Sequence, residues 1–296
     1  MVFMRYLSLS ILFTLIFHPV LSQRAFAKDR LKVAVTILPE KFFVEKIGGS
    51  LVEVEVMVPP GANPVSYEPK ASQMRVLSKA SIYFSIGVPV EKTWLKRFME
   101  LNPGMIVVPL YEGIQRIPIS GHNHKNHTEG FMDPHVWLSP PLTFIMARNV
   151  AYALVEKLPG NAKYLFENYQ KLIRDIARID SEIMDIFQRV KRKRKGPFAF
   201  MVFHPSWGYF ARSYGLLQLP IEIEGKEMKP GRLLELASKA KKLSIQAVFV
   251  QPQFSKRQAE VLAESLGLKV EVIDPLAEEW DKNILKVART IGRYLE

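Results

Sequence analysis

A single long helix is predicted in the middle of this chain, and it limits the folds that the chain can adopt. Over residues 162–190, large apolar side chains recur at three- and four-residue steps, which is the spacing of one helical face. The members of this stripe are Leu165, Leu172, Ile176, Ile179, Ile183 and Ile186. A helix of that length exceeds the usual globular helix and suits a spacer between two lobes.

Strand and helix patterns alternate on both sides of this helix, which is typical of parallel sheets with helices on their faces. The sequence therefore predicts an α/β fold of two parallel-sheet lobes joined by one long rigid backbone helix. The predicted strands cover residues 31–36, 51–58, 82–86 and 105–109 before the helix, and residues 198–203, 247–250 and 270–273 after it. The predicted parts are an N-terminal lobe at 28–160, a connecting helix at 161–195 and a C-terminal lobe at 196–296.

The first residues predict a secretory signal peptide. Residues 1–5 are short and basic, residues 6–20 form an almost unbroken apolar run, and Ala25-Phe26-Ala27 is an A-x-A cleavage signal. The apolar run is too short for a spanning helix. We therefore expect residues 1–27 to be cleaved and the mature chain to be periplasmic.

The composition excludes several classes of protein. The chain has no cysteine, which excludes a disulfide framework, thiolate zinc sites and thiol catalysis. It also contains no Walker loop, dinucleotide fingerprint, G-x-S-x-G or H-E-x-x-H. The net charge of +12 does not name a partner by its sign alone.

A basic run at residues 191–195 follows the long helix. Cations are favourable at a helix C-terminus, and neither interleaved aromatic residues nor a nucleic-acid motif accompanies the run. It is therefore predicted to be a solvated helix end, and no nucleic-acid partner is expected.

Three side chains that can bind a metal are predicted at strand ends or in a stiff loop. His135 lies in the proline-containing loop of residues 133–140, while His204 and Asp274 each follow a predicted strand. Ligands of open α/β sheets bind at the carboxyl ends of strands. Two imidazoles and a carboxylate suit Zn²⁺ and, less well, Mn²⁺ or iron.

Four stretches taken together resemble the solute-binding proteins of zinc/manganese ABC importers. They are residues 60–69 (PGANPVSYEP), residues 133–140 (DPHVWLSP), the strand–helix corner at His204 and residues 274–276 (DPL). The resemblance covers nearly all of the mature chain in order, including a histidine-rich loop and the long helix. It implies two α/β lobes on a rigid helical backbone, with one divalent metal ion in the cleft between them.

The resemblance also implies the ligands and the partner. Carried over residue by residue, it supports His135, His204 and Asp274 as the metal ligands. The expected function is capture of a divalent metal, Zn²⁺ first and Mn²⁺ second, and its delivery to the membrane permease of an ABC importer. The expected protein is a monomer that binds and releases its cargo and is not an enzyme.

The sequence departs from the family pattern at Val65. Family members usually place a metal-binding histidine after the Gly-x-x-Pro turn, at the position of this valine. Three outcomes are open: water completes a site with three protein ligands, a loop histidine supplies a fourth bond, or metal binding is weakened or lost. Glu68 is close enough in sequence to donate an oxygen, and a surface or helix-capping role would also suit it.

Residues 113–130 interrupt the alternation with a polar loop that carries His122, His124 and His127. Histidine-rich tracts can collect metal weakly and pass it on. The loop is predicted to contact metal because it adjoins the segment of His135, and the alternative is a disordered insertion.

Two other functions remain open at this point. A zinc centre with two histidines, one aspartate and an open position is also found in hydrolases, although no motif here supplies a general base. The second is a metal-free binding paralogue, because of Val65. A triad of Ser206, His204 and Asp274 is disfavoured, since serine and histidine on one short loop rarely have the geometry of a nucleophile and its base.

Overall fold

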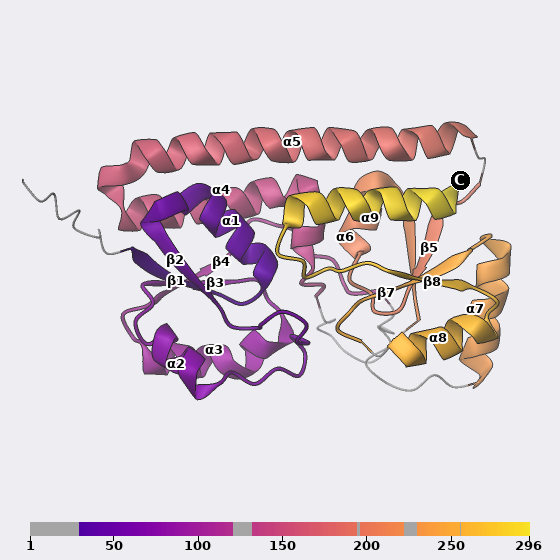
Figure 1. Cartoon of the computed structure of the whole chain (residues 1–296), viewed down its shortest axis with the longest axis horizontal. Helices are drawn as coiled ribbons and strands as arrows, with labels where there is room; N and C mark the ends of the chain where they lie inside the picture. The colour runs from indigo at the N-terminus through magenta and orange to yellow at the C-terminus, as the bar shows by residue number, and fades with distance from the viewer. Residues whose placement is uncertain (1–29, 121–131, 194–195, 222–229, 255) are drawn as a thin grey trace, which may run out of the picture.

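The computed structural model describes residues 30–120, 132–193, 196–221, 230–254 and 256–296, and it contains two parallel sheets bridged by one helix (Figure 1). The predicted fold of two α/β lobes joined by a long helix is confirmed. The first sheet has the order β2-β1-β3-β4, from Val52–Val56, Leu31–Val35, Ile82–Ser85 and Ile106–Pro109. The second has the order β6-β5-β7-β8, from Leu217–Pro220, Ala199–Val202, Ala247–Val250 and Lys269–Val272.

Helices cover both faces of the first sheet, which explains why its inner strand β3 is buried along its whole length. Successive residues of a strand point to opposite faces, so Val33 and Val35 pack towards the long helix while Ala34 packs away from it. The helices on the long-helix side are α1 (Leu38–Gly48) and α4 (Pro140–Lys157), and those on the other side are α2 (Ala71–Leu77) and α3 (Pro89–Leu101) (Figure 1).

The second lobe repeats this arrangement. Its helices on the long-helix side are α6 (Gly208–Tyr214) and α9 (Trp280–Leu295), and those on the far side are α7 (Pro230–Lys242) and α8 (Lys256–Ser265) (Figure 1). Strand β6 was not predicted. It is a four-residue strand at the edge of the sheet, it ends in Pro220, and its Leu217 is exposed, so it lacks the continuous apolar run of its neighbours.

The bridging helix α5 (Ala162–Lys193) has 32 residues, which corresponds to a length of about 48 Å at 1.5 Å per residue. Its stripe packs against α1 and α4 near one end and against α9 near the other, so one apolar surface holds both lobes. The buried residues of the stripe are Leu165, Leu172, Ile176, Ile179, Ile183, Phe187 and Val190.

The basic end of α5 contacts the rest of the protein through two of its lysines. Lys193 Nζ lies 3.0 Å from a carboxylate oxygen of Glu296, and Lys191 Nζ donates to the carbonyl of Tyr214 at 3.0 Å. Residues 194–195 of the run lie outside the described residues. The side chain of Lys193 remains 61% exposed, as expected of a solvated helix end.

No helix in the described ranges is both long enough and apolar enough to cross a membrane. The predicted signal peptide at 1–27 lies outside the described residues.

A buried polar network fixes the loops that leave β1 and β3. Glu40 Oε2 accepts the main-chain N–H groups of Thr36 and Ile37 at 2.9 and 2.8 Å. Glu91 accepts the Thr36 hydroxyl on one oxygen and the Gly87 N–H on the other, the latter at 2.8 Å. Burial raises the pKa of both carboxyls, and the nearby Glu91 raises the pKa of Glu40 further.

This network predicts a pH dependence of stability. Glu40 ionises near its ordinary value of 4.5 when unfolded and at higher pH when folded, so its contribution is complete below pH 4.5 and is lost as the pH rises. Glu40→Gln keeps an oxygen for the two N–H groups and removes this titration. Above pH 4.5, we expect the free energy of unfolding to fall less steeply in Glu40→Gln than in the parent, with a difference in slope of at most about 1.4 kcal/mol per pH unit. Denaturant titrations followed by circular dichroism measure both profiles.

The matched control is Glu45→Gln, in the same helix but exposed to solvent, which should reproduce the pH profile of the parent. If Glu40→Gln also reproduces that profile, Glu40 does not retain its proton in the folded protein.

Candidate metal centre

A cavity of about 360 Å³ lies between the two lobes, where a metal site was predicted. Both lobes contribute to its wall, and two of the three predicted ligands, His135 and His204, are among the lining residues. The first lobe supplies Asn63, Pro64, Val65, Val88, Pro89, Ile119, Ser120, Pro134, His135 and Trp137, and the second supplies His204, Pro205, Gln253, Phe254, Pro275 and Leu276.

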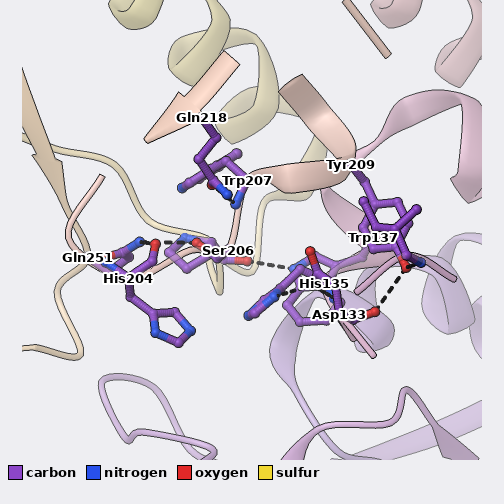
Figure 2. Close-up of polar contacts among 11 residues, drawn as sticks. Asp133, His135, Trp137, His204, Ser206, Trp207, Tyr209, Gln218 and Gln251 are labelled. Carbon is purple, nitrogen blue, oxygen red and sulfur yellow. Dashed lines mark hydrogen bonds and ion pairs between the residues drawn. The ribbon is translucent and has the colours of Figure 1, made fainter. Parts of the chain in front are cut away.

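Asp133 orients His135 within this wall. One oxygen of Asp133, Oδ1, accepts the main-chain N–H of His135 at 2.9 Å and lies 2.6 Å from the imidazole Nδ1 (Figure 2). A carboxylate at Nδ1 holds the ring proton there and leaves Nε2 to bind a metal. Asp133 is itself buried, and its carbonyl accepts the hydroxyl of Tyr209 in α6 at 3.0 Å.

The residues after His135 tie its loop to the second lobe. The short 3₁₀ turn Val136–Leu138 is buried, and its Trp137 donates from Nε1 to the carbonyl of Pro275 at 2.7 Å. In return, Trp280 Nε1 donates to the carbonyl of Trp137 at 2.7 Å. The loop of His135 is therefore bound to the segment that follows Asp274.

Gln251 holds the loop of His204. This buried side chain, at the end of β7, accepts the N–H of His204 at 3.2 Å and donates to the carbonyl of the same residue at 2.7 Å (Figure 2). It also donates to Ser206 Oγ at 3.1 Å. The ring of Phe254 stacks on the imidazole with ring centres 4.9 Å apart, so both the backbone and the ring of His204 are positioned.

The two imidazoles lie close together across the cavity. Their ring centres lie 5.5 Å apart, with the ring planes inclined at 72°. Two imidazoles bound to one tetrahedral zinc through nitrogens at 2.0–2.1 Å would have ring centres roughly 5 Å apart. The ring spacing of His135 and His204, which come from different lobes, is therefore compatible with one shared ion.

Asp274 lies beside the cavity and is not among the residues that line it. Its Oδ1 accepts the amide of Gln253 and the N–H of Leu276, both at 2.9 Å. In the described ranges, no three side chains of His, Asp, Glu or Cys are grouped closely enough to hold an ion. The role of Asp274 as third ligand stays a prediction.

Val65 lines the cavity, so the family's histidine position does face the site. The turn is fixed by the N–H of Val65, which donates to Asn63 Oδ1 at 2.9 Å, and 57% of the valine side chain is exposed. Glu68 is exposed and is not among the lining residues. The predicted metal contacts of His122, His124 and His127 fall outside the described residues.

Three residues of the site were not predicted. Asp133 could have been recognised, because the side chain of an aspartate often accepts the main-chain N–H of the residue two positions later, which here is His135, in an Asx turn. Gln251 and Gln253 have no local signal, since each acts on a loop that is distant in sequence.

Comparison with known proteins places the chain in a family. A sequence model described as "ZnuA: Zinc-uptake complex component A periplasmic" matches residues 33–293. The chain belongs to this family. The predicted resemblance to solute-binding proteins of metal importers is thereby confirmed. The chain is also similar to several curated proteins and solved structures.

Two curated relatives are similar to this chain over most of their own length. The high-affinity zinc uptake system protein ZnuA of Bacillus subtilis is 27% identical over 271 residues, which are 86% of this chain and 83% of the relative. A putative metal-binding protein of Treponema pallidum is 28% identical over 259 residues, 83% of this chain and 79% of the relative.

Solved structures agree in fold. A zinc-bound deletion mutant of ZnuA has a TM-score of 0.82 and 37% identity, covering 90% of this chain and 98% of that one. A manganese-bound mutant of a periplasmic metal-binding protein from Candidatus Liberibacter asiaticus has a TM-score of 0.77 over 90% and 100% of the two chains. At 20% identity, the second comparison supports the fold alone.

Gly208 packs against Asp133 so closely that we expect a larger residue at position 208 to weaken metal binding. A Cβ atom at Gly208 would lie 2.9 Å from Asp133 Oδ2, and the buried carboxylate cannot swing away while Oδ1 holds His135. Gly208→Ala should therefore move His135 and lower zinc affinity about 10- to 100-fold, as changes behind a metal ligand typically do. Isothermal titration with Zn²⁺ after chelator stripping measures this loss.

Gly160→Ala is the matched control, because no atom lies within 4 Å of a Cβ at that position. Equal zinc affinity in Gly208→Ala and Gly160→Ala would contradict the proposed role of Asp133 behind His135.

Proposed function

We propose that this chain is the extracytoplasmic solute-binding protein of an ABC importer, capturing Zn²⁺ between its lobes for delivery to the membrane permease. The observation that carries the proposal is the pair His135 and His204, one from each lobe, with ring centres 5.5 Å apart on one cavity. Membership of the ZnuA family supports it.

His135 and His204 would bind the ion, with Asp274 as the third protein ligand. His135 would bind through Nε2, because Asp133 occupies its Nδ1. Nitrogen ligands favour zinc, whereas manganese prefers sites rich in oxygen, so Mn²⁺ is the second choice of cargo.

Binding and release, without turnover, suit this site. A hydrolytic zinc centre needs a general base within reach of the metal-bound water. The described residues that line the cavity include no Asp, Glu or Lys, and no imidazole besides the two proposed ligands. A metal-free paralogue would be recognised by the absence of metal in protein purified without a tag.

The scaffold favours release through loop motion instead of wide domain closure. Both lobes pack on the single stripe of α5, and Trp137 joins them again beside the cavity. The turn at Val65 is exposed, and its described hydrogen bonds, from Val65 N–H to Asn63 and from Val90 N–H to the carbonyl of Pro64, stay within the first lobe, so we expect this turn to move on release. We further propose a monomer that reaches the periplasm through cleavage of residues 1–27 and has no nucleic-acid partner.

His204→Ala tests the ligand assignment. The change removes one of the three proposed protein ligands, and we expect tight zinc binding to be lost in isothermal titration of the stripped protein, with the fold retained by circular dichroism. Zinc affinity equal to that of the parent would contradict the assignment.

The histidine-rich loop provides a separate prediction. A variant with His122, His124 and His127 all replaced by alanine should lose weak additional zinc sites and keep the principal site, because His135 and His204 are unchanged. The number of zinc ions bound per chain in the same titration distinguishes loss of the weak sites from loss of the principal site. Loss of the principal site would identify a loop histidine as a ligand.

A further inference from the structure

Ile117 and Asp133 form an incomplete antiparallel pair beside the metal centre. The bridge next to this pair, between Pro118 and Met132, is antiparallel. The N–H of Asp133 donates to the carbonyl of Ile117 at 2.8 Å. A regular pair of this kind would exchange a second bond, from the N–H of Ile117 to the carbonyl of Asp133.

The hydroxyl of Tyr209 takes the place of that second bond. It accepts the N–H of Ile117 at 3.0 Å and donates to the carbonyl of Asp133 at 3.0 Å (Figure 2). Tyr209 belongs to α6 in the second lobe, whereas both main-chain groups belong to the first lobe. A side chain of one lobe therefore completes the pairing of two residues of the other.

The second lobe fixes the position of this hydroxyl. Tyr209 is only 3% exposed and packs in the hydrophobic core. One turn later in α6, Ser213 Oγ lies 2.7 Å from Ser139 Oγ and donates to the carbonyl of Tyr209 at 2.9 Å. Helix α6 thus holds both ends of the segment 133–139, which contains His135.

We propose that Tyr209 is a positioning residue of the metal centre, which sets the place of Asp133 and, through it, the ring of His135. This rests on the proposed function, because His135 acts there as a ligand of Zn²⁺. Asp133 Oδ1 lies 2.6 Å from His135 Nδ1, so a shift of the Asp133 main chain moves the carboxylate that orients the imidazole.

Loss of the hydroxyl would cause such a shift. The N–H of Ile117 and the carbonyl of Asp133 would both lose their partner, which is unfavourable for groups at least partly buried. The pair can recover one hydrogen bond by closing to the regular antiparallel arrangement. Closing moves Asp133 towards Ile117 and away from the place in which it orients His135.

Tyr209→Phe in the full mature chain tests the proposal, because it removes the hydroxyl and keeps the ring. Competition with a chromogenic chelator measures zinc affinity, and the visible spectrum of the Co²⁺-loaded protein reports the arrangement of the ligands. We expect Tyr209→Phe to bind Zn²⁺ about tenfold more weakly than the parent, as changes behind a metal ligand do. We also expect its Co²⁺ bands to shift.

Tyr214→Phe is the matched control. Tyr214 is a buried residue of the same helix, and its hydroxyl donates at 2.7 Å to Asp180 of α5 instead of to the segment of His135. The control also removes one hydrogen bond, so it should lower the free energy of unfolding in denaturant titrations, as Tyr209→Phe does. Its zinc affinity and Co²⁺ spectrum should be those of the parent.

The outcomes separate this proposal from the function on which it rests. Parent values of the zinc affinity or of the Co²⁺ spectrum in Tyr209→Phe would overturn the positioning role and leave zinc capture intact. An equal loss of affinity in Tyr214→Phe would also overturn it, since lower stability alone would then explain the loss. If the parent itself binds no Zn²⁺, both proposals fail.

Discussion

Two indole N–H groups connect the lobes at the site. Trp137 donates to the carbonyl of Pro275, and Trp280 donates to the carbonyl of Trp137, each at 2.7 Å and each from a buried ring. A buried N–H that loses its acceptor costs about 1–3 kcal/mol, so the pair resists separation of the segments that it joins. Since Trp137 follows His135 by two residues and Pro275 adjoins Asp274, these bonds set the distance between the two sides of the cavity.

The fold was predictable where apolar periodicity is strong. The stripe of α5 and the buried strands leave few alternatives, because each must bury its apolar face against another layer. The observed stripe differs in detail from the predicted one: Phe187 and Val190 are buried members that were not predicted, whereas the predicted member Ile186 is partly exposed. Strand β6 shows the limit, since an edge strand that ends in proline depends on its neighbour β5 for hydrogen bonds and has little signal of its own.

The sequence predicted the two histidines that line the cavity, but not the residues that position them. His135 and His204 combine a ligand side chain with a position at a stiff loop or strand end, and local sequence records both properties. The groups that position them are different. Gln251 reaches a loop 47 residues earlier in the chain, and Gly208 matters only because another lobe places Asp133 against it. Such contacts arise from tertiary approach, which the spacing of residues along the chain does not encode.

The packing of α5 has a consequence for biogenesis. Its second half is buried under α9, the last helix of the chain, which approaches so closely that a Cβ at Gly292 would lie 3.1 Å from Ile186. A polypeptide made from its N-terminus completes α5 long before α9 exists. The part of the apolar stripe that α9 covers therefore waits uncovered until α9 is made, although Phe187 can already pack against Phe210 and Tyr214 of α6. A chain truncated before Trp280 would present that part of the stripe to proteases and chaperones.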